Sequence, residues 1–362
     1  MKRFIIKIIL FSVITFGIIV SVNYMVDPAN MFHYSILDSM VDHLMKGEII
    51  ECPGNLDEGL LQEKMITSME HKPSTVIIGS SHIMYEKWEF ENYYCAGLSG
   101  AYLGDYYAIV GLLETADIHP ERIVIGVDPW SFMTGATNGR HSSITEYSRY
   151  AKELVQGNEH TESPMANGWT VRKIQELFSF SYFQSSLADL RMNGIERCLH
   201  RNETESIVIC HDDEIGEVSK ILPNGRRVFA KAGIGDVKTN TENAQKAIEA
   251  RGIYQLGSGF REPQYENLAE FEELIQYLQK QGIEVIFYLH SWYPCVYDFF
   301  ETNEDYLGII ELEQYIRNMA DKNQIIVHGS YNPYEVGVTE KDFADWFHLK
   351  PESMMDCYVY IR

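Results

Sequence analysis

The sequence predicts an α/β protein with a mostly parallel sheet flanked by helices, joined to an apolar segment at its N-terminus. Short β-branched runs alternate with amphipathic helical patterns along the 362 residues. Strands and helices in this order form parallel sheets that are covered on both faces. The aromatic content of 12% also supplies enough apolar surface to bury a core, which argues against disorder.

The N-terminal segment predicts a membrane anchor. From Phe4 to Val22 the chain is apolar for about 19 residues apart from Lys7 and a few small polar residues, close to the ~20 that cross a bilayer. Lys2, Arg3 and Lys7 lie at its N-terminal end, so the positive-inside rule keeps that end cytoplasmic. We therefore expect a single-pass protein of the cell membrane with an extracytoplasmic body. A cleaved signal peptide and a buried core helix are the alternatives.

The elements of the body follow from short-range patterns. Four apolar runs predict strands, at 74–80, 122–127, 284–289 and 324–328, and helical spacing predicts helices at 102–116, 266–281 and 306–322. The segment 132–262 is polar and breaks this rhythm, so we interpret it as an insertion or lid. The predicted organisation is a cytoplasmic tip and anchor at 1–23, a membrane-proximal segment at 24–73, and an extracytoplasmic domain at 74–362.

Charge and cysteine usage exclude several functions. Acidic residues outnumber basic ones by 52 to 30, for a net charge of −22, which argues against a nucleic-acid binder and against docking on anionic lipid by charge alone. Six cysteines fit an oxidising compartment, and Cys198 and Cys210 are close enough to bridge a local loop. No C-x-x-C occurs and no His lies at ligand spacing, so we expect neither a metal nor a cofactor.

Three segments predict chemistry at the carboxyl ends of strands, where open α/β sheets bind ligands. Ser81 lies in a Gly-Ser-Ser-His segment directly after the first strand, and a Gly-Leu-Ser-Gly segment ends at Gly100. Asp345 precedes His348 by three residues, so it can accept the Nδ1 proton and leave the other nitrogen as a base. Each segment alone usually forms an ordinary loop or surface pair, but their order favours a serine-dependent site.

This order resembles the SGNH (GDSL-type) hydrolase superfamily. The resemblance implies a flavodoxin-like sheet, Ser81 as nucleophile, His348 as base and Asp345 as its orienting acid. It also implies an oxyanion hole that includes the backbone N–H groups of Ser81 and Gly100. The family's Gly-x-Asn-Asp block has no clean match; the nearest segment has Asp128 where an Asn donor is expected.

An N-terminal anchor with Gly-Ser-Ser-His and a late Asp-x-x-His resembles a narrower group, the membrane-anchored proteins that work beside membrane-bound O-acyltransferases. They include teichoic acid D-alanyl transfer proteins and polysaccharide O-acetylation proteins. The likeness covers the anchor and roughly residues 74–131 and 284–351. It implies a serine acyltransferase or esterase acting on cell-envelope glycans or teichoic acid. The alternative is a non-catalytic partner that binds a glycan or acyl carrier for a membrane acyltransferase.

Four further side chains are candidates for substrate binding, and each has a structural alternative. His82 follows the nucleophile and could instead cap the turn, whereas His290 follows a strand and could instead pack or face solvent. Trp130 and Trp346 flank the expected crevice and could stack on a sugar ring or fill the core. Arg140 and His141, in the insertion, could reach the site as part of a lid.

Overall fold

The computed structural model describes residues 2–28, 32, 36–54, 56–158, 163–164, 174–199 and 207–353. The chain divides into two compact units. One comprises residues 1–43 and 163–208, and the other comprises residues 44–162 and 209–362. The expected insertion at 132–262 is therefore divided, because its middle part groups with the N-terminal helix and its two flanks group with the sheet.

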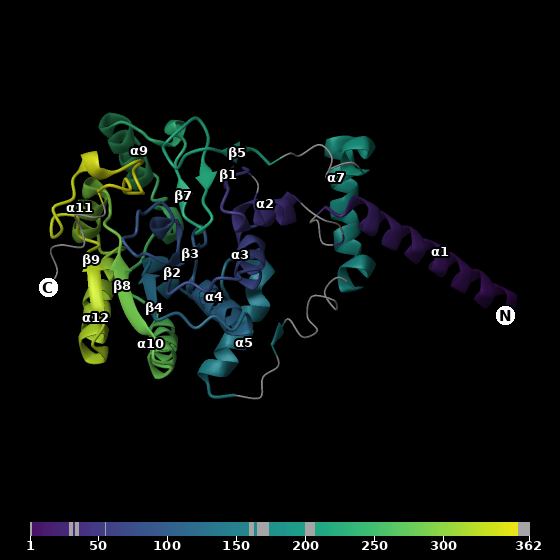
Figure 1. Ribbon diagram of the computed structural model, residues 1–362, viewed down its shortest axis with the longest axis horizontal. Coiled ribbons are helices and arrows are strands. Elements are labelled where there is room, and N and C mark those ends of the chain that lie inside the picture. The colour runs from purple at the N-terminus through teal and green to yellow at the C-terminus, as the bar shows by residue number, and fades with distance from the viewer. Residues whose placement is uncertain are drawn as a thin grey trace. The chain divides into compact units, whose positions relative to one another are not determined.

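The smaller unit is built around helix α1 (Lys2–Val26), purple in Figure 1. This helix is long and apolar enough, by length and composition, to cross a membrane, with a mean hydropathy of 2.6. At its C-terminal end the Asn23 carboxamide donates hydrogen bonds to three backbone carbonyls between Glu176 and Ser179. The Tyr182 hydroxyl, from α7 (Phe180–Leu199), donates to Asp27 at 2.6 Å. These contacts hold the C-terminal end of α1 against residues 176–182, which lie in the middle of the segment that the sequence predicts as an insertion.

The larger unit contains a five-stranded parallel sheet (Figure 1). Its strands are β2 (Thr75–Gly79), β3 (Tyr93–Gly97), β4 (Arg122–Gly126), β8 (Glu284–Leu289) and β9 (Ile326–Gly329). They lie in the order β3-β2-β4-β8-β9 and every neighbouring pair is parallel. Counted along the chain this is the order 2-1-3-4-5, a doubly wound arrangement that reverses direction between the strands here named β2 and β4.

The predicted strands are confirmed, and β3 is an addition to them. The segment 93–97 carries two tyrosines, a cysteine and a glycine, so it lacks the β-branched run that predicts a buried strand. The segment can form a strand without such a run because it lies at the edge of the sheet, where only one neighbouring strand of the parallel sheet pairs with it. The backbone N–H of Cys95 donates to the Asn224 carbonyl rather than being left to solvent.

Helices cover the sheet as the sequence predicts. α4 (Leu103–Thr115) packs on β2, α10 (Tyr265–Lys280) on β8, and α12 (Gly308–Asn323) on β9. The predicted apolar stripe of α10 is buried. Other helices within the described residues include α2 (Ile36–Met45), α3 (Glu58–Thr67), α5 (Thr145–Val155), α9 (Val237–Glu249) and α11 (Pro294–Thr302).

A second, antiparallel sheet lies beside the edge of β3. It has the order β5-β1-β6-β7 and comprises β5 (Ile209–Cys210), β1 (Ile49–Glu51), β6 (Lys220–Ile221) and β7 (Arg227–Val228). Strands of two or three residues are too short to show a period-2 pattern, so the sequence did not predict them. Cys210 has a free thiol, so the predicted bridge to Cys198 is wrong.

The backbones of α4 and α5 approach closely at Gly111, where a Cβ atom would overlap the Tyr147 carbonyl oxygen. We expect Gly111→Ala to lower the free energy of unfolding by about 1–3 kcal/mol, because the overlap outweighs the better helix propensity of alanine. Thermal or urea unfolding of the full chain in detergent measures this. Gly252→Ala is the control, because nothing lies within 4 Å of that Cβ position. Equal stability of the two variants would contradict the close approach.

Candidate active site

Ser81 lies directly beyond the carboxyl end of β2, at the start of a short 3₁₀ turn over Ser81–Ile83. The Ser80 hydroxyl caps this turn by accepting a hydrogen bond from the His82 backbone N–H at 3.2 Å. The turn sits where the strand order reverses, which is the position at which doubly wound sheets bind their ligands. Ser81 itself is 6% exposed.

The structure brings Ser81, His348 and Asp345 together in one hydrogen-bonded chain. The Ser81 Oγ lies 2.9 Å from His348 Nε2, and His348 Nδ1 lies 2.8 Å from Asp345 Oδ2. With the Nδ1 proton donated to the carboxylate, Nε2 carries the lone pair that accepts the serine proton. This is the geometry that activates a serine hydroxyl as a nucleophile.

Asp345 is held in place by its own loop. Its Oδ1 accepts the backbone N–H groups of Phe347 and His348 at 2.6 and 2.7 Å, and Phe343 pairs with Leu349 to close the loop. Burial would raise the pKa of this carboxyl, but the His348 charge and the hydrogen bonds lower it overall. Asp345 is therefore ionised at neutral pH and favours the Nδ1–H form of the imidazole.

Backbone donors are present for an oxyanion. Within the part of the chain that is described, neither the Ser81 nor the Gly100 backbone N–H has a hydrogen-bond partner. Gly100 adopts a φ of +61°, in the left-handed region that favours glycine. Both residues follow adjacent parallel strands, β2 and β3, so their free N–H groups lie along the same edge of the sheet.

Asp128 lies beneath the nucleophile turn and acts as an acceptor there. It receives hydrogen bonds from His82 Nδ1 at 2.7 Å and from the Tyr106 hydroxyl at 3.4 Å, and Ser80 lies close to it. Burial raises its pKa to about 7. In the sequence Asp128 stands where the resemblance implies an Asn donor to the oxyanion, with a structural role as the alternative. The structure instead engages its oxygens with the turn that carries Ser81, which is a positioning role.

His82 and His290 form a buried stack with ring centroids 3.7 Å apart and an interplanar angle of 9°. Both side chains are about 95% buried, as the structural alternative for each of them predicts. His290 Nε2 accepts the backbone N–H of Leu349 at 3.3 Å, and the His82 ring lies 4.3 Å from that of Phe347. The stack therefore links the nucleophile turn to the loop that carries His348.

The two predicted tryptophans differ in their placement. Trp130 is fully buried, and its indole N–H donates to the Ala101 carbonyl at 2.8 Å, so the alternative of core packing is correct and stacking on a sugar is not. Trp346 is half-buried and lies between Asp345 and Phe347 in the loop that carries His348. Of the four candidates for substrate contact, Trp346 alone keeps a surface that a substrate could reach.

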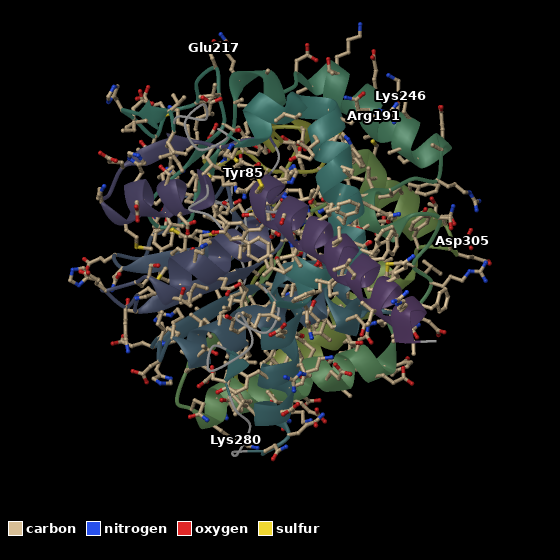
Figure 2. The ribbon with its side chains drawn as sticks, turned by 90° about the vertical axis from the view of Figure 1, so that its right-hand side faces the viewer. Tyr85, Arg191, Glu217, Lys246, Lys280 and Asp305 are labelled. Atoms are coloured by element: carbon tan, nitrogen blue, oxygen red, sulfur yellow. The ribbon has the colours of Figure 1, made fainter. Side chains whose placement is uncertain are left out.

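Sequence reasoning missed three side chains around Ser81 and His348. The Tyr254 phenol lies close to the Ser81 hydroxyl, and its ring packs 4.2 Å from Phe347. On another side of the base, Tyr85 (labelled in Figure 2) stacks on Phe229, and its ring lies 5.7 Å from that of His348. Tyr254 and Phe229 come from the inserted region, and no local pattern marks them. The positive φ of Tyr254, +37°, is a signal that only the folded chain carries.

Three histidines gather here, but no group of three His, Cys, Asp or Glu side chains in the described ranges could hold a metal ion. No protein-family model matches the chain, and no curated protein matches it in sequence. The site is therefore characterised by its own geometry.

Protonation of the histidine stack is expected to cost stability. Burial and the neighbouring His82 and His348 lower the pKa of His290 well below 6.5. The unfolded chain then takes up this proton at higher pH than the folded chain, so the histidine weakens the fold as the pH drops below about 6.5. As the pH is lowered from about 6.5 to 5, we expect the unfolding free energy of wild type to fall relative to that of His290→Gln. The expected size of this relative loss is about 1 kcal/mol per pH unit.

The measurement is urea unfolding of both proteins across that pH range. His119→Gln is the control, because His119 is exposed and pairs only with the exposed Asp117. A difference between wild type and His290→Gln that does not change with pH would contradict a buried neutral His290.

Proposed function

We propose that this chain is a membrane-anchored serine acyltransferase or esterase of the SGNH type, acting on O-acyl groups of cell-envelope glycans or teichoic acid. The observation that carries the proposal is the hydrogen-bonded chain from Ser81 through His348 to Asp345. The two free backbone N–H groups of Ser81 and Gly100 support it. The strand order of the sheet and the absence of the Gly-x-Asn-Asp block are compatible with a divergent member of that superfamily.

The proposed reaction has two halves. His348 Nε2 takes the proton of Ser81 as its Oγ attacks the ester carbonyl, and Asp345 stabilises the resulting imidazolium. The carbonyl oxygen gains negative charge, which the N–H groups of Ser81 and Gly100 stabilise; one such donor is typically worth ~10²–10³ in rate. The tetrahedral intermediate then expels the alcohol, which takes the proton from His348 and leaves the acyl group on Ser81.

The second half repeats these steps with a different nucleophile. A sugar or alditol hydroxyl, or water, gives its proton to His348 Nε2 and attacks the acyl-serine. Ser81 leaves and recovers its proton from His348. Transfer and hydrolysis thus share one set of residues and differ only in the acceptor.

The proposed location follows from helix α1. Its length and apolar composition suit a single membrane span, and the charges of Lys2, Arg3 and Lys7 favour a cytoplasmic N-terminus. The larger unit would then face the cell envelope, where acylated polymers and a membrane-bound O-acyltransferase partner are found. Residues of the inserted region, among them Tyr254, would act as the lid over the bound acyl group.

We expect a fluorophosphonate probe to label the full-length chain covalently at Ser81. Ser81→Ala should abolish the labelling, and His348→Ala should slow it by at least ~10²-fold, because the serine then has no base. Ser185→Ala is the matched control, since its hydroxyl only bonds back to its own helix. Labelling is read by gel fluorescence and located by mass spectrometry.

Labelling that persists in Ser81→Ala would remove Ser81 from the mechanism. If a folded wild-type protein is not labelled at all, the crevice serves binding rather than catalysis. The chain would then be a glycan- or carrier-binding partner of a membrane acyltransferase.

The carboxylate of Asp345 can be tested separately. Asp345→Asn keeps the size of the side chain but presents a donor or a neutral acceptor to His348, which favours the wrong imidazole tautomer. We expect the rate of ester hydrolysis to fall about 10³–10⁴-fold, measured with a chromogenic acetate ester. Asp321→Asn, on the exposed face of α12, is the control. A loss below tenfold would show that Asp345 does not orient the base.

A further inference from the structure

Arg140 lies beside the proposed oxyanion hole. Its Nη1 is 2.5 Å from the point where a Cβ atom of Gly100 would be, and Gln255 Nε2 is 2.8 Å from the same point. Burial raises the pKa of the Tyr254 phenol, and the charge of the nearby Arg140 acts against that rise. Two nitrogen donors from distant parts of the chain therefore border the backbone that is expected to hold the reacting oxygen.

The backbone that carries Arg140 is fixed. The buried carboxylate of Asp105 accepts the backbone N–H groups of Arg140 and His141 at 2.8 and 2.9 Å, and His141 Nε2 lies 3.1 Å from the Ser99 carbonyl. Gly139 packs so closely that a Cβ there would lie 2.9 Å from Asp105 Oδ1. The exposed guanidinium thus extends from a rigid base.

Gln255 is held in a matching way. The Tyr102 hydroxyl donates to Gln255 Oε1 at 3.1 Å, so the amide presents its NH₂ group toward Gly100. The segment that carries Gln255 is held by the Tyr306 hydroxyl, which donates to the Gly257 carbonyl at 2.8 Å. Arg251 of the same segment pairs with Asp305, which is labelled at the periphery in Figure 2.

The positive charge of Arg140 is not neutralised locally. In the portion of the chain that the structure covers, no carboxylate lies within ion-pair distance of its guanidinium. The nearby Glu58 is committed to Arg227 at 2.7 Å and to Ser99. Asp105 receives only backbone N–H groups on this side. In a chain of net charge −22, a guanidinium beside Ser81 that pairs with no described carboxylate is available to bind an anion.

We propose that Arg140, assisted by Gln255, binds a carboxylate or phosphate group of the ester substrate and so selects anionic substrates for Ser81. The donor set fits such a group, because a guanidinium offers a planar fork of N–H groups and an amide adds another donor. The inference rests on the proposed acyl-transfer function and names its substrate class. The anionic group belongs either to the acyl chain or to the alcohol that carries it.

Matched ester pairs separate these two sources. For the acyl side, 4-nitrophenyl adipate with a free carboxylate is compared with its methyl ester. For the alcohol side, an O-acetylated glucuronate is compared with its methyl ester, and an O-acetylated glycerol phosphate with O-acetylglycerol. The readout is the ratio of kcat/KM for the anionic member to that for the neutral member of each pair.

In Arg140→Gln we expect this ratio to fall about 10–100-fold for the side that carries the anion, since a charge-assisted pair is lost. Arg140→Lys should retain part of the selectivity, because it keeps the charge without the fork. Arg149→Gln is the matched control, since Arg149 is exposed on α5 and pairs with Glu153. An unchanged ratio on both sides would overturn the inference, while probe labelling of Ser81 would continue to support the proposed function.

Binding provides a readout that does not depend on turnover. Monomethyl adipate and inorganic phosphate are titrated calorimetrically into full-length Ser81→Ala and into Ser81→Ala with Arg140→Gln. We expect the second protein to bind at least one of these anions about tenfold more weakly. If this loss occurs while the folded wild-type protein is not labelled by the fluorophosphonate probe, the anion site stands and the enzymatic function fails. Equal binding by both proteins would contradict the site.

Discussion

The hydrogen bond between Ser81 and His348 joins positions 267 residues apart, and the rest of the site depends on it. Two strands, β4 and β8, separate β2 from β9 in the sheet, so the loop that carries His348 has to reach back across the carboxyl edge. Phe347 makes this possible. Its ring packs against His82, Trp292 and Tyr254 at 4.3, 5.6 and 4.2 Å, which fixes the loop over the end of β2.

Beneath that hydrogen bond lies a layer of buried polar groups. Asp128 links the His82 ring to the Tyr106 hydroxyl, and His290 links the end of β8 to the backbone of Leu349. Buried polar groups cost free energy unless their hydrogen bonds are made. In return they permit few alternative arrangements. This matters because a nucleophile and its base have to be held within about 0.5 Å of their productive positions. The layer thus trades stability for a defined geometry.

Local patterns were enough to predict most of the sheet. The runs at 74–80, 122–127 and 284–289 lie in buried central strands, where side chains on both faces are apolar. The edge strand β3 and the short strands of the second sheet were not predicted, because at an edge pairing and not composition defines the strand. Ser81, Asp345 and His348 could be found because their order along the chain matches a known arrangement and their spacing fits known chemistry.

The surroundings of the triad could not be found in the same way. For His82, Trp130 and His290 the sequence left substrate contact and a structural role open, and burial in the folded chain favours the structural role for each of them. Conversely, Tyr254 and Gln255 carry no local signal of function, and for Arg140 the sequence suggested only a place in a lid. Their importance arises from backbone contacts, such as those of Asp105 with residues 140 and 141, and these depend on the whole fold.

The late position of the base in the chain has a consequence for biosynthesis. The sheet is complete at Gly329, but the imidazole and its carboxylate follow only at 345–348. A growing chain therefore carries Ser81 through the synthesis of the 267 residues that separate it from His348 before a group able to activate it has been made. In the proposed mechanism the newly made protein stays inert toward acylated polymers until residue 348 has emerged.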